Sequence, residues 1–276
     1  TPTTTNMAEK QEDLLWYFAY GSNMNDKVLK RRKVSPRRSV PTRVPGWRLT
    51  YDLRGLPFVE PSFADIEPLE KGDTTPEVQG VCHLITQHEF DGIVATEGGG
   101  GVSKHGYHQV FVDAIPVQGE DRTPIKAISL SVGPDPLMKH HGRLHLPSRR
   151  YVKLLVDGAK HYQLEPKYIE WLESHESYDR SNHVRHKLLF YFLFAGLLPL
   201  ALPMLLFFVI NGLLLKYLPK QMYKKWAIVS QTVLQAIGRL IWSYHDLAFL
   251  IFGQFGLIKV VHGGSKNVLC SPKPSR

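Results

Sequence analysis

An uncharged apolar run between Leu188 and Leu215 is the feature that most constrains this chain. Leu and Phe supply more than half of its positions, and the run holds no Asp, Glu, Lys or Arg. As one straight helix it would be about 42 Å long at about 1.5 Å per residue. That length exceeds the ~30 Å hydrocarbon core of a bilayer. Soluble domains rarely bury a helix so long and so apolar, so residues 188–215 are predicted to be a membrane segment.

Two topologies for this segment stay open. Pro199 and Pro203 lie inside it, and a proline in a helix interior removes a backbone hydrogen bond. The segment is therefore either a hairpin that enters one leaflet or a kinked single span. Basic residues flank both ends, so the positive-inside rule does not choose. These flanking residues are Arg180, Arg185 and Lys187 on one side and Lys216, Lys220, Lys224 and Lys225 on the other.

The bulk composition conceals this segment. The chain has 276 residues, 43% of them hydrophobic, a mean hydropathy of -0.18 and a net charge of +9. Residues 27–43 hold eight Lys or Arg and no acid, and residues 216–276 hold nine with a single acid. Such patches suit an anionic membrane surface. The first patch lacks interleaved aromatic side chains for base stacking, so no nucleic-acid partner is expected.

The chain divides into five expected parts. Residues 1–13 are polar, lack an apolar leader and are expected to be disordered. Residues 14–187 form the globular body, and residues 188–215 the membrane segment. Residues 216–261 are expected to form amphipathic helices in the membrane interface, and residues 262–276 a disordered tail. Only two cysteines occur, which indicates no disulfide framework and a reducing compartment. We therefore expect an intracellular membrane protein whose body faces the cytosol.

Within the body, hydrophobic periodicity and capping signals predict an α+β fold. The expected strands are residues 14–20, 47–53, 78–85, 107–117 and 125–132, and the expected helices are residues 25–33, 87–95, 149–161 and 167–175. Residues 54–77, rich in Pro, Gly and acid, are predicted to be a long surface loop. Because the strands do not alternate regularly with helices, they favour a small mixed β-barrel with flanking helices.

Three short patterns within the body point to one kind of chemistry. The first strand ends in Tyr20-Gly21-Ser22-Asn23, a tight turn whose successive N–H groups can hold a carboxylate or an oxyanion. The helix after the capping box of Thr86 ends in Glu97-Gly98, and Tyr151 lies at the start of a later helix, after Pro147-Ser148. In this order the chain resembles the γ-glutamylcyclotransferase family over roughly residues 14–178.

The resemblance implies a fold, an activity and a set of residues. It implies release of 5-oxoproline from γ-glutamyl amino acids or related conjugates, without a cofactor or a metal. Glu97 is implied as the catalytic base and then acid, and Tyr151 as a substrate-binding hydroxyl. The backbone of the first strand and its turn is implied to bind the γ-glutamyl group. The residues of that segment are Tyr17, Phe18, Ala19, Tyr20, Gly21 and Ser22.

The chemistry fits these residue types. A γ-glutamyl amide can cyclise when its own α-amine attacks the γ-carbonyl, but the amine is normally protonated. A carboxylate beside it can remove a proton and later return one to the departing amine. Without the family pattern, Glu97 would be read as an ordinary solvated glutamate at a helix end.

Departures from the family pattern leave the substrate open. Gly98–Gly101 form a glycine-rich segment after Glu97, and Ser129 stands where relatives can carry a second substrate-facing tyrosine. The leaving group is an amino acid, an amine or part of a glutathione adduct. A membrane-anchored binding module without turnover is the alternative that involves no catalysis.

Two other patterns do not predict a site. Gly98–Lys104 lacks the order of a phosphate-binding loop. His140, His141 and His145 lack the carboxylate or cysteine that a metal site would need.

Overall fold

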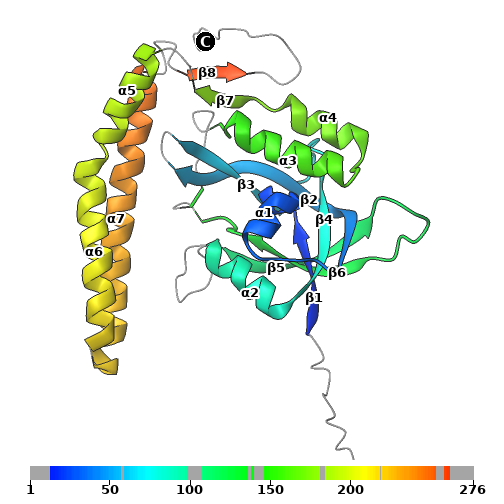
Figure 1. Ribbon diagram of the computed structural model, residues 1–276, viewed down its shortest axis with the longest axis horizontal. Coiled ribbons are helices and arrows are strands. Elements are labelled where there is room, and N and C mark those ends of the chain that lie inside the picture. Colours follow the sequence, from blue (N-terminus) through cyan, green and yellow to red (C-terminus); the bar gives the residue numbers. More distant parts are fainter. Residues whose placement is uncertain are drawn as a thin grey trace, which may run out of the picture.

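The structure is a computed structural model, and it describes residues 13–56, 59–97, 107–135, 138–139, 146–180, 184–217, 219–252 and 258–261. Figure 1 shows a compact body beside a pair of long antiparallel helical segments. The strands are β1 Leu14–Ala19, β2 Arg38–Leu56, β3 Glu60–Pro68, β4 Glu77–Thr86, β5 His108–Pro116, β6 Ile125–Ser131, β7 Ser177–Arg180 and β8 Ile258–Val261. The helices are a short 3-10 turn at Ser22–Met24, then α1 Asp26–Arg31, α2 Gln87–Thr96, α3 Arg149–His161, α4 Pro166–Ser174, α5 Val184–Ala195, α6 Leu198–Tyr217 and α7 Lys220–Phe252.

The body is a closed mixed barrel, as expected for the α+β class. The sheet has the order β3-β2-β4-β1-β6-β5, and an additional pairing of β2 with β5 closes the ring. β1 is central: it runs antiparallel to β4 and parallel to β6. Its last residues, including Phe18 and Ala19, are fully buried. The turn after β1 therefore lies at one end of the barrel, next to α1 and α3 (Figure 1).

Local signals predicted four of the helices closely. Asn25 caps α1 and accepts a hydrogen bond from the Lys27 N–H, and Thr86 and Glu89 form a complete capping box at the start of α2. Ser148 caps α3, which spans the predicted residues 149–161. Pro166 occupies the first turn of α4. These predictions held because each helix begins with a side chain that satisfies its unpaired N–H groups, or with a proline that has none.

The predicted surface loop over residues 54–77 is wrong for residues 54–56 and 60–68, which are strands, and right for residues 69–76, which lie between β3 and β4. β2 continues to Leu56, and β3 pairs with it antiparallel from Glu60 to Pro68. The segment has loop-like composition because a charged group is buried in it: Asp65 is inaccessible to solvent and lies 3.2 Å from the Lys139 ammonium. Pairing offsets the desolvation of both charges. When the partner cation of a buried carboxylate is far away in the sequence, the local composition predicts a surface loop where the structure has a buried strand.

The C-terminal region differs from the prediction in its helix boundaries. Residues 188–215 do not form one continuous helix, since α5 ends at Ala195 and α6 begins at Leu198. Pro199 lies in the first turn of α6, where its missing N–H is not needed, and the helix continues through Pro203. In Figure 1, α5 and α6 follow one another along α7, so the chain reverses near Pro219 and not at Pro199 or Pro203.

Residues 216–261 form mainly one helix, not several. α7 runs for 33 residues, and β8 then pairs antiparallel with β7. In the described part of the chain, none of the helices combines the length and the apolar character that crossing a bilayer requires. The expected tails, residues 1–12 and 262–276, lie outside the described residues.

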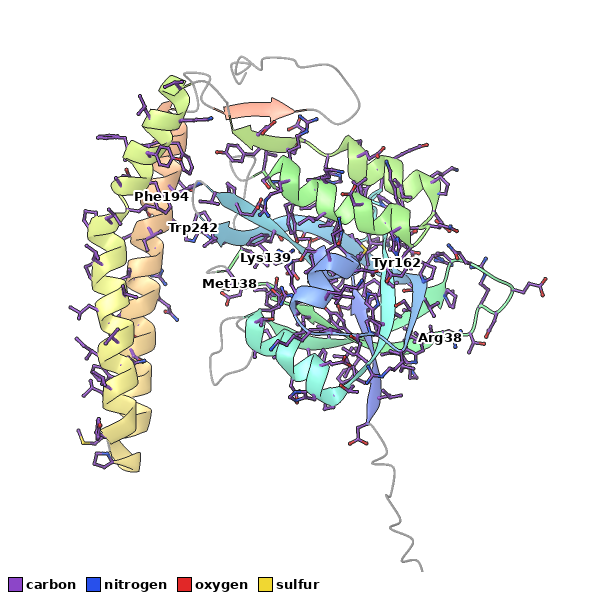
Figure 2. The ribbon with its side chains drawn as sticks, in the orientation of Figure 1. Arg38, Met138, Lys139, Tyr162, Phe194 and Trp242 are labelled. Atoms are coloured by element: carbon purple, nitrogen blue, oxygen red, sulfur yellow. The ribbon has the colours of Figure 1, made fainter. Side chains whose placement is uncertain are left out.

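The helical segments contact the body through α7, β7 and β8. The Arg54 guanidinium lies over the ring of Trp242, 5.2 Å from its centre, and Figure 2 shows Trp242 on the side of α7 that faces the body. Gly196 permits a close crossing, because a Cβ there would lie 2.2 Å from the Tyr244 hydroxyl. β7 in turn contacts the start of α3, where the Tyr178 N–H donates to the Pro147 carbonyl.

Candidate active site

One cavity of about 150 Å³ opens at the end of the barrel where β1 ends. Its walls come from segments far apart in the sequence: the end of β1 and its turn, the ends of α1 and α2, β3, β6, the residue before β5 and the start of α3. The lining residues are Tyr17, Tyr20, Gly21, Ser22, Asn23, Arg32, Phe63, Ala64, Glu97, Tyr107, Leu130 and Tyr151. Four tyrosines, one carboxylate and one guanidinium thus meet in a small space.

The turn after β1 is tight and forms one wall. It is closed by hydrogen bonds from the Met24 N–H to the Gly21 carbonyl and from the Asn25 N–H to the Ser22 carbonyl. The N–H groups of Gly21 and Ser22 take no part in closing it. A Cβ on Gly21 would lie 3.3 Å from the Tyr151 hydroxyl, so glycine keeps this part of the cavity open.

Tyr151 reaches the cavity from the first turn of α3. Ser148 fixes that turn by accepting the Tyr151 N–H at 3.0 Å. The Tyr151 hydroxyl accepts a hydrogen bond of 3.2 Å from the Ala64 N–H of β3, which leaves its own proton for another acceptor. Burial raises the pKa of Tyr151 far above its usual range, opposed by the Ala64 hydrogen bond and reinforced by the charge of Glu97. The hydroxyl is therefore a neutral donor at physiological pH.

Hydrogen bonds fix the hydroxyl groups of two further tyrosines of the cavity. The Asn23 amide donates to the Tyr17 hydroxyl at 2.9 Å, and the Tyr20 hydroxyl donates to the Leu130 carbonyl at 2.6 Å. Burial raises the pKa of both phenols well above 10, so both keep their protons. Asn23 Oδ1 is buried and finds no hydrogen-bond partner among the described residues. A buried acceptor at the cavity wall suits a cationic or N–H group of a ligand.

A buried charge cluster lies behind Tyr20. Lys139 is only 4% exposed and contacts Asp52, Asp65 and Glu67 at 3.2–3.3 Å. Desolvation alone would lower the pKa of Lys139, but these carboxylates outweigh it and raise that pKa. Asp65 also lies 3.3 Å from the Tyr20 hydroxyl. The cluster therefore fixes the base of the cavity without entering it.

Glu97 is the C-terminal capping residue of α2. Its N–H donates to the Ile93 carbonyl, and its carboxylate Oε1 lies 2.5 Å from Nη2 of Arg32. The side chains of Arg32 and Glu97 are 20% and 23% exposed, so the pair is accessible from the mouth of the cavity. The segment 98–106 that follows, including the predicted glycine-rich stretch, lies outside the described residues.

The structure brings most of the predicted site residues together. Glu97, Tyr151 and four members of the β1 segment (Tyr17, Tyr20, Gly21 and Ser22) line the same cavity. Phe18 and Ala19 do not, since both are buried in the barrel core. Ser129 also lies away from it, donating from β6 to the Phe18 carbonyl at 2.8 Å.

Three polar residues of the cavity were not predicted as site residues. The sequence indicates Tyr107 as the start of a strand, where the family commonly has a tyrosine, Asn23 as part of the turn, and Arg32 as one charge in a basic run; the structure places all three at the cavity. The helical period could have separated Arg32 from its neighbours. It follows the buried Val28 and Leu29 by four and three residues, so it shares their inward side.

His83 lies beside the site and is expected to make the free energy of unfolding depend on pH. It pairs with Tyr17 in the β1–β4 ladder, is fully buried, and its Nδ1 lies 2.8 Å from the Ser39 hydroxyl. Desolvation lowers its pKa to about 4, against the opposing charge of Asp26. The unfolded chain, with an ordinary histidine pKa near 6.5, therefore binds the proton more readily as pH falls.

We expect the free energy of unfolding to fall by about 1–2 kcal/mol between pH 7.5 and pH 5.5 on account of His83. Full stability is present above pH 6.5, and the loss continues down to about pH 4. Urea unfolding of wild type and of His83→Asn at the two pH values measures it. The asparagine variant is expected to lose less; equal losses would contradict the assignment to His83.

No group of three or more His, Cys, Asp or Glu within the described residues could hold a metal ion. His140, His141 and His145 lie outside the described residues.

Comparison with known proteins assigns the chain to a family, although no protein-family model matches it. Gamma-glutamyl cyclotransferase aclK of Aspergillus oryzae is 34% identical over 169 residues, covering 58% of this chain and 60% of that protein. Gamma-glutamyl cyclotransferase verK of Clonostachys rogersoniana is 34% identical over 126 residues, covering 41% of this chain and 68% of that protein. A solved structure of a gamma-glutamyl cyclotransferase covers 62% of this chain and 92% of its own, at 22% identity and a TM-score of 0.47.

The chain belongs to the gamma-glutamyl cyclotransferase family, on the strength of the match to verK. It spans about three fifths of the length of aclK and 63% of gliK from Aspergillus fumigatus. Because the similarity covers only part of these proteins, the activity and the substrate of this chain are proposed from the geometry of its site.

Proposed function

We propose that this chain is a γ-glutamylcyclotransferase that converts γ-glutamyl conjugates to 5-oxoproline and a free amine. The observation that carries the proposal is the convergence of Glu97, Tyr151 and the Gly21–Ser22 turn on one cavity. These three elements belong to different helices and to the end of a central strand. A glutamate turned away from the turn would instead have favoured a binding module without turnover.

The proposed reaction balances without an external nucleophile. The substrate's α-amine, once deprotonated, attacks the γ-carbonyl carbon; this C–N bond forms and the original amide C–N bond breaks. Of the three protons of the α-ammonium group, one stays on the lactam nitrogen and two leave with the departing amine. Glu97 takes the first of these two protons before the attack and the second after it, and returns each to the departing nitrogen; proton transfer of this kind contributes typically 10²–10⁴-fold.

The remaining groups supply geometry and charge complementarity. The N–H groups of Gly21 and Ser22 are proposed to bind the substrate carboxylate or the oxyanion that develops on the γ-carbonyl. Tyr151 has a free proton to donate there, because its oxygen already accepts from Ala64. Holding the flexible chain of the γ-glutamyl group in a folded conformation removes much of the entropic barrier to ring closure.

The volume of the cavity indicates which part of the substrate can be enclosed. A space of about 150 Å³ is comparable to a cavity that holds one benzene ring, which suits the γ-glutamyl group. The departing amine then lies at the mouth, beside Arg32 and Glu97. We propose γ-glutamyl amino acids as substrates, with γ-glutamylamines and glutathione adducts as the competing classes that share this γ-glutamyl group.

Product analysis tests the proposed function. Wild-type protein incubated with γ-glutamyl-alanine should release 5-oxoproline and alanine in equal amounts. The same assay with γ-glutamyl-ethylamine and with a glutathione S-conjugate ranks the three classes by kcat/KM. Release of glutamate would indicate hydrolysis instead of cyclisation. Saturable binding without any product would support the non-catalytic alternative.

We further propose that the helices after residue 184 attach the chain to an intracellular membrane, with the body on the cytosolic side. Support comes from large apolar side chains that α5 and α6 leave exposed, several more than half exposed. They include Leu188, Tyr191, Phe192, Leu202, Leu205, Leu206, Val209 and Leu213. The basic patch in residues 216–276 suits an anionic leaflet. Attachment at the interface requires an apolar face and does not require a spanning helix.

Partition onto vesicles measures this attachment. Phe192→Glu and Leu206→Glu should each weaken sedimentation with phosphatidylcholine–phosphatidylserine vesicles by about 10-fold or more, as burial of one large apolar side chain contributes about 1.5–3 kcal/mol. Phe111→Glu is the matched control, because Phe111 is 77% exposed on β5 and belongs to the body. Sedimentation of the helix variants at the wild-type level would remove the proposed surface.

A further inference from the structure

We propose that Arg32 is a positioning residue that fixes the carboxylate of Glu97 so that its second oxygen serves as the base. This inference rests on the proposed function. Among the described residues that line the cavity, Arg32 alone carries a fixed positive charge, and its Nη2 lies 2.5 Å from Glu97 Oε1. One carboxylate oxygen is thereby engaged, and Oε2 is left outside this ion pair.

The position of Arg32 follows from its place on α1. The basic run contains several cations, but Lys30, Arg31 and Lys33 are exposed, whereas Arg32 is partly buried. Arg32 is the C-terminal capping residue of α1, and its N–H donates to the Leu29 carbonyl. Leu29 is almost fully buried, so the inward side of α1 directs this one guanidinium toward the cavity.

Arg32 makes two contacts at the end of α2, not one. Its Nη1 donates to the Thr96 hydroxyl, and that hydroxyl donates to the Ile93 carbonyl at 2.9 Å. The guanidinium therefore bridges a hydroxyl anchored to α2 and the carboxylate of the next residue. A planar fork can hold both groups at once, which a lysine ammonium on a flexible stem cannot do with the same geometry.

Glu97 needs such a restraint because of where it lies. It is the C-terminal capping residue of α2, and four glycines follow it in the sequence. Glycines have no side chain with which to hold a neighbouring carboxylate. A general base must keep within hydrogen-bond reach of the proton that it removes, about 2.6–3.2 Å. Within the described part of the chain, Arg32 at the end of α1 provides the restraint.

The kinetic signature of positioning separates it from substrate binding. Arg32→Ala is expected to lower kcat by about 10- to 100-fold, with KM changed less than about threefold, because misplacement by about 1 Å can cost about 100-fold. The loss should be the same for γ-glutamyl-alanine and γ-glutamyl-ethylamine, and added guanidinium ion should restore part of it. Arg32→Lys should recover less than guanidinium does.

Arg31→Ala is the matched control: it removes the same charge one residue earlier, from an exposed side chain outside the cavity, and should keep wild-type kinetics. Thr96→Val tests the second contact without removing a charge, and should lower kcat by about 3- to 10-fold even if Arg32→Ala folds poorly.

Three results would overturn the inference: an unchanged kcat in both variants, a rise confined to KM, or a loss confined to the substrate whose leaving group carries a carboxylate. A wild-type protein that releases no 5-oxoproline would refute the proposed function itself, before any variant is compared.

Discussion

Replacing Glu97 by glutamine is expected to lower the rate of 5-oxoproline release by about 100- to 10,000-fold. Glutamine keeps the size of the side chain and can still accept a hydrogen bond from Arg32. It cannot take a proton from the substrate's ammonium group. The substrate would therefore bind in the protonated, unreactive state. Steady-state release of 5-oxoproline from γ-glutamyl-alanine measures the effect.

The same substitution elsewhere provides the control. Glu170→Gln changes an exposed carboxylate on α4 and should leave the rate unchanged. Thermal unfolding should show that Glu97→Gln is folded, because Glu97 is partly exposed and its partner remains. Substrate binding to the inactive variant, measured by calorimetry, should persist. Wild-type turnover by a folded Glu97→Gln protein would assign the base to another group.

The elements that could be predicted from the sequence are those with local causes. The capping box of Thr86 and Glu89 fixes the start of α2, and therefore the position of Glu97 ten residues later. The Tyr20–Asn23 turn follows a strand whose apolar residues are contiguous, as expected for the buried centre of a barrel. Each of these signals lies within a few residues of the structure that it predicts.

The parts that could not be predicted depend on partners far away in the sequence. β3 holds Asp65, whose cation Lys139 lies on a separate loop. Arg32 and Glu97 belong to two helices, and no local pattern relates them. β8 completes its ladder with β7 after the whole of the helical region. Non-local pairs of this kind leave only a change of composition in the sequence, and in β3 this composition is typical of a surface loop.

The packing of α3 against the turn after β1 leads to the second large expected effect. A Cβ at Gly158 would lie 2.9 Å from the Cβ of Met24 and 3.2 Å from its carbonyl carbon. Neither atom can move without shifting the backbone of the turn. Gly158→Ala should therefore lower the free energy of unfolding by about 2–3 kcal/mol, as overpacking of a filled core does. Chemical denaturation measures this loss.

Gly92→Ala is the matched control, because it separates the effect of helix propensity from the effect of contact with Met24. Gly92 is also inside a helix, but a Cβ there meets no atom within 4 Å. Alanine should stabilise that site by up to about 1 kcal/mol, since glycine is the poorer helix former. Gly158 would gain the same helix propensity, so the difference between the two variants isolates the cost of contact with Met24. Because α3 carries Tyr151 and Met24 ends the turn that holds Gly21, a shift of α3 away from Met24 is expected to move Tyr151 relative to that turn. Gly158→Ala should accordingly reduce turnover in the protein that remains folded, whereas Gly92→Ala should not; equal stability in the two variants would show that α3 and the turn are not tightly packed.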